Sequence, residues 1–340
     1  MSETIMNGLV LYNFHYMDYS ISEAVDTFEG VSTLGHILLR KISVVSQATQ
    51  LEDLYNQRLR FWKYDMFGKE KGDKYRKRMT ICAYLSRGLL IVTFTTAVFL
   101  GIRPIFVESK TLPEPLFVPG NNKFLKIFFY VAEMFYLCEL ILLTSFYDGT
   151  FLMMCGELEI QFQILKMAIR SIKIGEDSTL EHEETCCNQL KSCSLYHLFL
   201  KKVHHNLNKT FSIFVVFQYG VSVVGICINL FILNSEESTL TQKMTAIMYM
   251  QPVSLQLAFI FIPASNVGIE SESLADAIFD VDWYNAKNMK MRKHILFMIT
   301  NALEPLGFTG AGLFDINRTV FLQILRISFS IFTLLRQTTK

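Results

Sequence analysis

The sequence is poor in charged residues. Asp, Glu, Lys and Arg make up 19% of its 340 residues, and the formal net charge is +1. An average soluble domain contains about 25% of these residues, and a nucleic-acid-binding protein gathers Lys and Arg on one surface. The composition therefore argues against a soluble nucleic-acid-binding protein, and no nucleic-acid partner is expected.

The motifs of common enzymes and metal sites are also missing. The sequence contains no Gly-rich phosphate loop, no catalytic-triad pattern and no HExxH motif. The stretch from His182 to Cys193, "HEETCCNQLKSC", lacks the paired C-x-x-C spacing that zinc sites favour. The seven Cys are not spaced as a secreted disulfide framework. We therefore expect no enzyme, no metal and no cofactor.

Long uncharged stretches are what the sequence does have. Residues 210–235 and 244–269 each run for 26 positions without a charge, and about 20 apolar residues cross a membrane core. Two weaker apolar stretches are interrupted by charges: one contains Arg87, and the other contains Glu133 and Glu139. We expect those carboxylates to pair within a helix bundle, with a basic ligand as the alternative for one of them. The pattern predicts an all-α membrane protein with helices at about 18–44, 79–103, 125–150, 210–235, 244–269 and 317–338.

The positive charges predict an orientation. Residues 58–87 hold ten Lys and Arg against three Asp and Glu, and cytoplasmic loops carry such an excess. The bias places loops 50–85, 160–208 and 270–316 in the cytosol, and loops 103–124 and 235–243 with the C-terminus outside. Counting back puts Met1 outside, although no basic residue precedes Arg40 to form a signal peptide. The count therefore predicts that a first transmembrane helix is missing.

Helical stripes continue beyond the predicted membrane spans. Leu158, Phe162, Leu165 and Ile169 recur at spacings of four and three, as does a second set from Tyr196 to Leu207. We expect residues 158–209 and 270–316 to form packed cytosolic anchor extensions, with a helix on the membrane surface as the alternative. The sequons at Asn208 and Asn317 fall inside or at the edge of the membrane in this topology, so they should not be glycosylated.

The last predicted helix carries one polar stripe. Thr319, Gln323, Arg326, Ser330, Thr333 and Gln337 follow spacings of four and three along one face, and Val320, Ile324, Ile327, Ile331 and Leu334 cover another. A polar stripe in a membrane must face water or partner groups. The stripe therefore indicates either a wet pore wall or hydrogen bonding to neighbouring helices.

Several segments, taken in order, resemble the insect odorant receptor family. They are "TLPEPLFVP" after a predicted span, "ESESLADAIFDVDWYN" after the 244–269 span, and "ALEPLGFTGAGLFDINRTVFLQILRISFSIFTLL" near the end. The family ends in Ser-Tyr-Ser-Tyr-Phe-Thr-Leu-Leu. This chain has Phe329 and Ile331 in place of the two tyrosines. The resemblance covers residues 18–338.

The resemblance implies a fold and an assembly. The expected fold has seven transmembrane helices, a cytosolic N-terminus and an extracellular C-terminus, and residues 1–338 would form a single receptor-channel domain that lacks the first helix. The family's receptors are odorant-gated, non-selective cation channels in the plasma membrane of sensory neurons. They assemble as tetramers with a common co-receptor. A gustatory-type receptor is the nearest alternative, and a transporter with internal pseudo-symmetry is a more distant one.

The resemblance also places a pore and a gate. Leu334 and Thr338 match the family's narrow outer gate by position, and Gln337 lies beside it. Thr338 departs from the apolar residue expected there, which fits a subunit that borrows its gate from a co-receptor. The expected pore and gate residues are Gln323, Arg326, Ser330, Thr333, Leu334, Gln337 and Thr338.

The ligand pocket is expected in the outer half of the bundle. Ligand sites are mostly apolar with a few placed polar groups, so small volatile or lipophilic odorants are the expected ligands. The candidate lining residues are Val25, Phe28, Ser32, Thr95, Val98, Phe99, Met134, Phe135, Leu137, Met248, Tyr249 and Gln251. Ordinary helix packing is the alternative for each of them.

Overall fold

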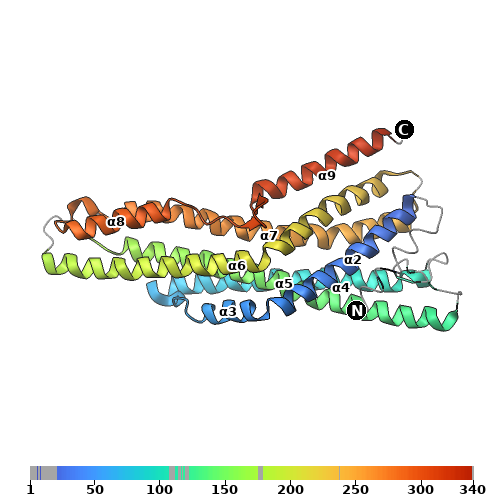
Figure 1. The fold of residues 1–340 in the computed structure, drawn as a ribbon, viewed down its shortest axis with the longest axis horizontal. Coiled ribbons are helices and arrows are strands. Elements are labelled where there is room, and N and C mark those ends of the chain that lie inside the picture. The colour runs from blue at the N-terminus through green and yellow to red at the C-terminus, as the bar shows by residue number, and fades with distance from the viewer. Residues whose placement is uncertain are drawn as a thin grey trace.

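The chain folds into long helices that lie side by side along one axis (Figure 1). The computed structural model describes residues 6, 8, 21–106, 112, 113, 116, 118, 122–174, 179–236 and 238–338, without the side chains of 21–26, 106, 180 and 335–338. In chain order the elements are α2 (Ile21–Ser46), α3 (Ala48–Arg58), η1 (Tyr64–Phe67), α4 (Lys69–Phe106), α5 (Lys123–Arg170), α6 (Leu180–Asn234), α7 (Leu240–Phe279), η3 (Trp283–Asn285), α8 (Met289–Ala302), β1 (Thr309–Gly310), β2 (Phe314–Asp315) and α9 (Arg318–Thr338).

Two helices are far longer than a membrane requires. α5 has 48 residues and α6 has 55, so at about 1.5 Å per residue they extend roughly 70 and 80 Å, against a hydrocarbon core of about 30 Å. They join two halves of the bundle. We call the half that contains α2 and the α6–α7 connection the apolar half, and the half that contains α8 and the α5–α6 connection the extension half (Figure 1).

Each predicted span lies within or overlaps a helix. Among the described residues, the helices long and apolar enough to cross a membrane are Lys69–Ile105, Lys123–Arg170, Glu181–Asn234 and Leu240–Asn285. α2 falls short of that measure, because charged residues such as Glu29, Arg40 and Lys41 interrupt its apolar sequence. Such a helix needs protein or water on one side.

One boundary differs from the prediction. The segment 50–85, expected as a loop, is largely helical, because it holds the end of α3, η1 and the start of α4 at Lys69. Lys, Arg and Glu are good helix formers. A charged sequence therefore marks the end of a membrane span without marking the end of the helix.

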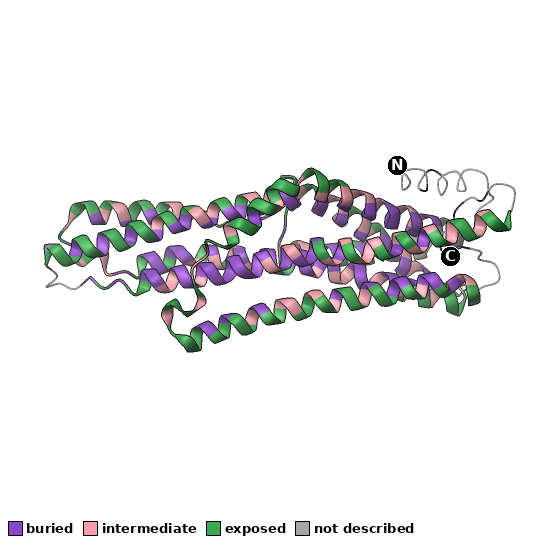
Figure 2. Ribbon diagram, turned by 90° about the horizontal axis from the view of Figure 1, so that it is seen from below, coloured by how far each residue is buried: buried purple, intermediate pink, exposed green. Residues whose placement is uncertain are grey.

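The extension half has a packed core. Leu158, Phe162 and Leu165 of α5 are fully buried, as are Leu200 and Val203 of α6. They belong to one large cluster that continues into α7 and α8, and Figure 2 shows the buried residues on the faces that the long helices turn toward one another. The helical stripes therefore pack within the bundle instead of lying on a membrane surface.

Two carboxylates in the extension half form hydrogen bonds between segments that are distant in the sequence. The buried carboxylate of Glu157 accepts hydrogen bonds from Arg58 at 2.8 Å and from Tyr64 at 2.5 Å. Glu183 accepts from the backbone amides of Lys287 and Asn288 at 2.8 and 2.7 Å, directly before α8. These bonds satisfy amides at the start of a helix, which otherwise have no intrahelical partner.

Candidate ligand pocket and pore helix

Two hydroxyl groups meet inside the apolar half, from helices distant in the chain. The Ser32 hydroxyl of α2 is hydrogen-bonded to the Tyr249 hydroxyl of α7, and both side chains are buried. Gly225 of α6 lies against the same pair of helices, since a Cβ there would stand 3.6 Å from the Tyr249 ring and 4.0 Å from the Phe28 ring. Phe28, Ser32, Gly225 and Tyr249 therefore line a common junction of α2, α6 and α7.

A second set of contacts joins α4 and α5 to α7. Thr96 donates a hydrogen bond to the backbone oxygen of Met248 at 3.2 Å. Tyr130 donates to the backbone oxygen of Gly101 at 2.9 Å. A Cβ on Gly101 would stand 2.8 Å from the Met134 sulfur, so the Met134 thioether occupies the space a side chain would need. α4 therefore contacts both α5 and α7, two of the helices that were expected to line the pocket with it.

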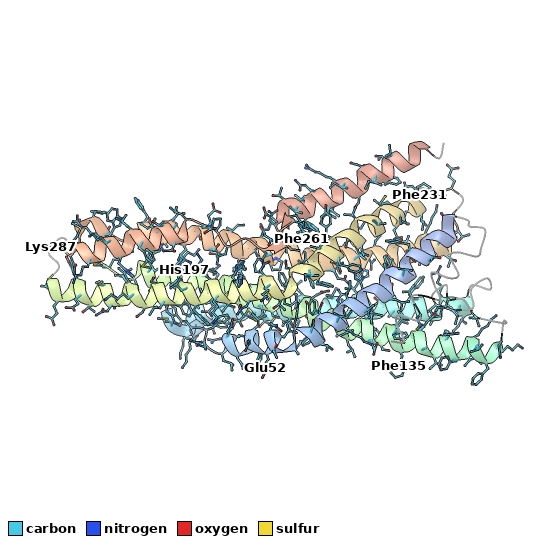
Figure 3. All side chains as sticks on the ribbon, viewed as in Figure 1. Glu52, Phe135, His197, Phe231, Phe261 and Lys287 are labelled. Atoms are coloured by element: carbon cyan, nitrogen blue, oxygen red, sulfur yellow. The ribbon has the colours of Figure 1, made fainter. Side chains whose placement is uncertain are left out.

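The structure divides the expected pocket residues into two groups. Phe28, Ser32, Phe99, Met134, Leu137, Met248 and Tyr249 are buried or half-buried, whereas Thr95, Val98, Phe135 and Gln251 are exposed on the surface of the bundle. Figure 3 shows Phe135 on the outer side of α5. The side chain of Val25 lies outside the described residues.

Sequence reasoning chose a neighbouring face of α4. Thr96, Ala97 and Leu100 are buried where Thr95 and Val98 are exposed. Successive residues turn by about 100° on a helix, so a shift of one position moves a side chain from the interior to the surface. Gly225 was not among the predicted pocket residues either. A glycine inside an uncharged span was the signal in the sequence that could have indicated a close approach of helices there.

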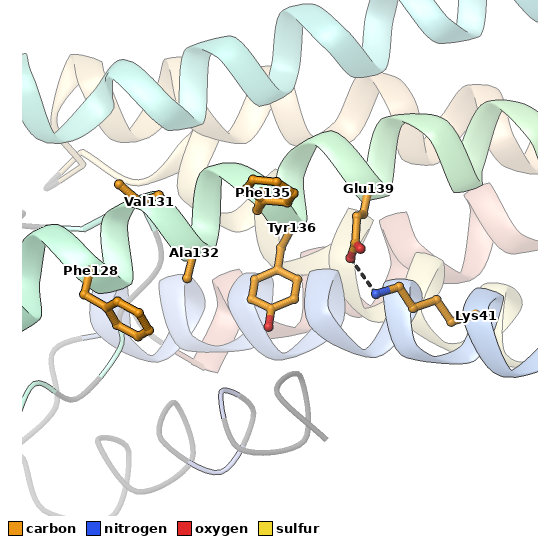
Figure 4. Close-up of a pocket in the computed structure, with 7 residues that line it drawn as sticks. All are labelled: Lys41, Phe128, Val131, Ala132, Phe135, Tyr136 and Glu139. Atoms are coloured by element: carbon orange, nitrogen blue, oxygen red, sulfur yellow. Dashed lines mark hydrogen bonds and ion pairs between the residues drawn. The ribbon is translucent and has the colours of Figure 1, made fainter.

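An external groove lies on the other side of α5. It has a volume of about 330 Å³ and is lined by Lys41, Phe128, Val131, Ala132, Phe135, Tyr136 and Glu139 (Figure 4). Lys41 and Glu139 form an ion pair of 2.6 Å within it. Glu139 therefore pairs with a helix of the bundle, but at its half-exposed outer surface and not in its interior. This groove is separate from the Ser32–Tyr249 junction.

The described residues offer no cluster suited to a metal. No group of three or more His, Cys, Asp or Glu side chains lies close enough among them to hold an ion. In the "HEETCC" segment the Cys186 sulfur lies 3.5 Å from the His182 Nε2, and that nitrogen is also 3.1 Å from the Lys173 carbonyl oxygen.

α9 contacts the bundle through one face. Ile324, Ser328 and Phe332 are buried at four-residue spacing, and the Ser328 hydroxyl donates to the Val223 carbonyl of α6 at 3.3 Å. The other faces of α9 are largely exposed. Figure 1 shows that the C-terminal end of the helix diverges from the bundle. The apolar face expected from sequence is only partly used, since Ile327, Ile331 and Leu334 are exposed.

The polar stripe of α9 turns away from the bundle. Gln323, Arg326 and Ser330 are exposed and Thr333 is half-buried. The hydroxyls of Ser330 and Thr333 donate to carbonyls of α9 itself, at 2.9 and 2.7 Å. The side chains of Gln337 and Thr338 lie outside the described residues. The α9 hydroxyl that bonds to a neighbouring helix, Ser328, is not in the stripe.

A β-hairpin connects α8 to α9 and is fastened to α6. β1 and β2 pair antiparallel around a three-residue connection, 311–313. Its first two residues, Ala311 and Gly312, adopt φ of 48° and 71°, the left-handed values suited to the central residues of the turn that the Leu313 amide closes on the Gly310 carbonyl at 2.8 Å. The amide of Thr309 donates to the Asn208 side chain at 3.0 Å, and the amide of Ala311 donates to the Ser212 hydroxyl at 2.6 Å. The Ser212 hydroxyl also donates to the Thr309 carbonyl at 2.9 Å.

Both sequon asparagines have structural contacts. Asn208 holds the hairpin, and the Asn317 side chain accepts a hydrogen bond from the Val320 amide at 2.9 Å, which is the N-cap interaction at the start of α9. Each carboxamide is thus part of the connection that positions α9.

Known proteins resemble this chain in sequence. The sequence model of the "7tm Odorant receptor" family matches residues 20–329. Odorant receptor Or2 of Anopheles gambiae is 25% identical over 264 residues, which are 73% of this chain and 67% of that protein. Odorant receptor 10 of Aedes albopictus is 26% identical over 274 residues, which are 77% of this chain and 68% of that protein.

A solved structure shares the fold. The insect olfactory receptor OR5 of Machilis hrabei, determined in complex with eugenol, superposes with a TM-score of 0.82 over 99% of this chain and 87% of its own, at 16% sequence identity. The predicted resemblance and the all-α membrane fold are confirmed. Because the family model matches most of its length, this chain belongs to the 7tm odorant receptor family.

Proposed function

We propose that this chain is the ligand-binding subunit of an odorant-gated, non-selective cation channel that works with a common co-receptor in the plasma membrane of sensory neurons. The attachment of α9 carries the proposal. The helix packs by one face and leaves Gln323, Arg326 and Ser330 exposed, and polar groups at membrane depth require water or partner groups. A pore shared with neighbouring subunits supplies both.

The Ser32–Tyr249 junction is the proposed ligand pocket. Its surroundings are apolar, because the half-buried ring of Phe28 and the Tyr249 ring both face Gly225 of α6 at this junction. An apolar lining with few polar groups suits a small lipophilic molecule. One hydroxyl or carbonyl group on the ligand would exchange for the Ser32–Tyr249 hydrogen bond.

Recording currents tests the assembly. The chain is expressed in cells with and without the co-receptor, and whole-cell current is measured during application of an odorant panel. We expect cation current only from the co-expressed pair. Odorant-evoked current from this chain alone would contradict the co-receptor requirement, and odorant uptake without current would favour a transporter.

Pocket variants test the site. Ser32→Ala and Tyr249→Phe each remove one partner of a buried hydrogen bond worth about 0.5–1.5 kcal/mol, so the EC50 of an effective odorant should change roughly two- to tenfold. Phe135→Leu is the matched control, because Phe135 is 72% exposed on α5 and should leave the EC50 unchanged. Equal effects of all three substitutions would argue against this pocket.

A further inference from the structure

One face of α2 connects the proposed pocket to a buried ion pair. Phe28, Ser32, His36 and Arg40 follow four-residue spacing and so lie along one side of the helix. Phe28 and Ser32 are at the junction with Tyr249. Arg40 lies two turns further along α2 and is fully buried. A ligand that displaces Phe28 and Ser32 therefore also displaces Arg40, because all three residues belong to one rigid helix.

Arg40 holds α2 against two other helices. Its guanidinium donates to the Asp148 carboxylate of α5 at 3.0 Å, and its central carbon lies 4.6 Å from the centre of the Phe214 ring of α6. One turn away, the His36 ring meets Phe217 of α6 edge-on at 5.3 Å. The buried ion pair holds α2 against α5. The ring contacts of Arg40 with Phe214 and of His36 with Phe217 hold α2 against α6, so α6 is expected to follow α2 at this level.

The same stretch of α6 holds the base of α9. Ser212, two residues before Phe214, bonds to the hairpin amide of Ala311 and to the carbonyl of Thr309. Asn208, one turn earlier, bonds to the amide of Thr309. The hairpin leads directly into α9 at Arg318. Residues 208–214 thus contact Arg40 through Phe214 at one end, and they hydrogen-bond to the hairpin through Asn208 and Ser212.

We propose that Arg40 and residues 208–214 of α6 form a mechanical connection between the odorant pocket and the base of the pore helix. Arg40 and Ser212 are positioning residues in this connection, because neither reaches the pocket or the α9 polar stripe. The gating part of the proposal rests on the proposed channel function. The physical coupling of α2 to the hairpin does not depend on it.

Hydrogen–deuterium exchange tests the coupling without a functional assay. The full-length chain in lipid nanodiscs is compared with Arg40→Gln, and exchange of the Thr309 and Ala311 amides is followed. We expect exchange at these amides to become at least threefold faster. Lys41→Gln is the matched control, since it breaks the neighbouring ion pair to α5 at Glu139 without touching the face that carries Arg40. Unchanged hairpin exchange in Arg40→Gln, or an equal rise in Lys41→Gln, would overturn the proposal.

A second variant guards against misfolding. If Arg40→Gln does not yield folded protein, Phe214→Leu removes the ring beneath the guanidinium and keeps the Arg40–Asp148 pair. The same threefold rise in exchange at Thr309 and Ala311 is expected, and no rise would refute the connection.

A mutant cycle tests the gating part. With the co-receptor present, the odorant EC50 is measured for Arg40→Gln, Ser212→Ala and the double variant. Residues on one connection should be non-additive, so the double variant should shift the EC50 no more than the larger single change. If the double variant instead shifted the EC50 by the product of the two single shifts, a shared route would be refuted. The control pair, Lys41→Gln with Ser212→Ala, should show such a product. Absence of any wild-type odorant current would refute the proposed function alone, because the exchange data would still decide the coupling.

Discussion

Arg326 is the charged residue on which the pore assignment depends most directly. It is exposed near the middle of α9, in a stripe whose hydroxyls bond within their own helix. A charge at such a depth costs about 2.5–3.5 kcal/mol on insertion scales unless it meets water or a partner. Its surroundings in the assembled channel therefore determine what it does.

We expect Arg326→Gln to raise single-channel cation conductance. A unit positive charge about 8 Å from a water-filled axis disfavours a cation by about 0.5 kcal/mol, which corresponds to roughly a twofold change. Patch-clamp recordings of the co-expressed channel measure this conductance. Unchanged conductance, together with reduced surface expression, would instead indicate that Arg326 pairs with a carboxylate of another subunit.

Two histidines should make the extension half sensitive to acid. Burial lowers the pKa of His197 and of His204 to about 4, below the value of about 6.5 that an exposed histidine has in the unfolded chain. The unfolded chain therefore binds more protons than the folded chain between these values, and the free energy of unfolding falls as the pH drops from 6.5 toward 4. At pH 5.5 each histidine should cost about 1 kcal/mol relative to pH 7.

Thermal unfolding of the purified protein between pH 7.5 and 5.5 measures this loss. His204→Phe keeps a ring against Phe308, whose centroid lies 4.3 Å from that of His204, and removes the titrating group, so the drop in Tm should become smaller. His182→Gln is the matched control, because His182 is exposed on the same helix, far from His204 in sequence. An identical pH dependence in wild type and His204→Phe would contradict the assignment.

At the scale of elements, the hairpin decides where α9 begins. Asn208→Ala should free the Thr309 amide and lower the maximal odorant current several-fold, because the lost hydrogen bond is worth about 0.5–1.5 kcal/mol. Whole-cell current, normalised to surface expression, is the measurement. The residue is part of an N-x-T sequon, so a lost glycan is the competing explanation.

Thr210→Val separates the two explanations. It destroys the same sequon and leaves Asn208 in place. Within the part of the chain that the structure describes, the Thr210 hydroxyl bonds to the Asn206 carbonyl of its own helix, at 2.9 Å. If the hairpin contact matters, Asn208→Ala is impaired and Thr210→Val is not. Equal impairment would point to glycosylation.

The helices could be predicted from sequence more completely than their contacts. Uncharged windows define spans by composition, so the cores of α6 and α7 were identified directly. α3 and the hairpin were not, since neither is long or apolar enough to give a membrane signal. The hydrogen bond between Ser32 and Tyr249 joins positions 217 residues apart. Spacing within one helix cannot predict a contact between residues so distant in the sequence. On α4, Thr95 and Val98 are exposed and Phe99 is half-buried, because neighbouring helices, not α4 itself, determine which side is buried.

At the scale of the whole molecule, the orientation proposed from charge remains a prediction. The α6–α7 connection should lie outside the cell and the extension half in the cytosol. Thr241→Cys and Lys290→Cys place exposed thiols at the two ends of the bundle. A membrane-impermeant maleimide should label Thr241→Cys on intact cells and Lys290→Cys only after permeabilisation, with wild type as the background. The opposite pattern would invert the topology.

The one-sided attachment of α9 also has an evolutionary consequence. Leu322, Leu325 and Phe329 contribute little to the folding of their own chain, because they are exposed on a helix held elsewhere by Ile324 and Phe332. In the proposed channel, selection at these positions would then act on which neighbours the helix meets. A duplicated copy of such a gene could change its choice of assembly partners while the inherited fold stays intact.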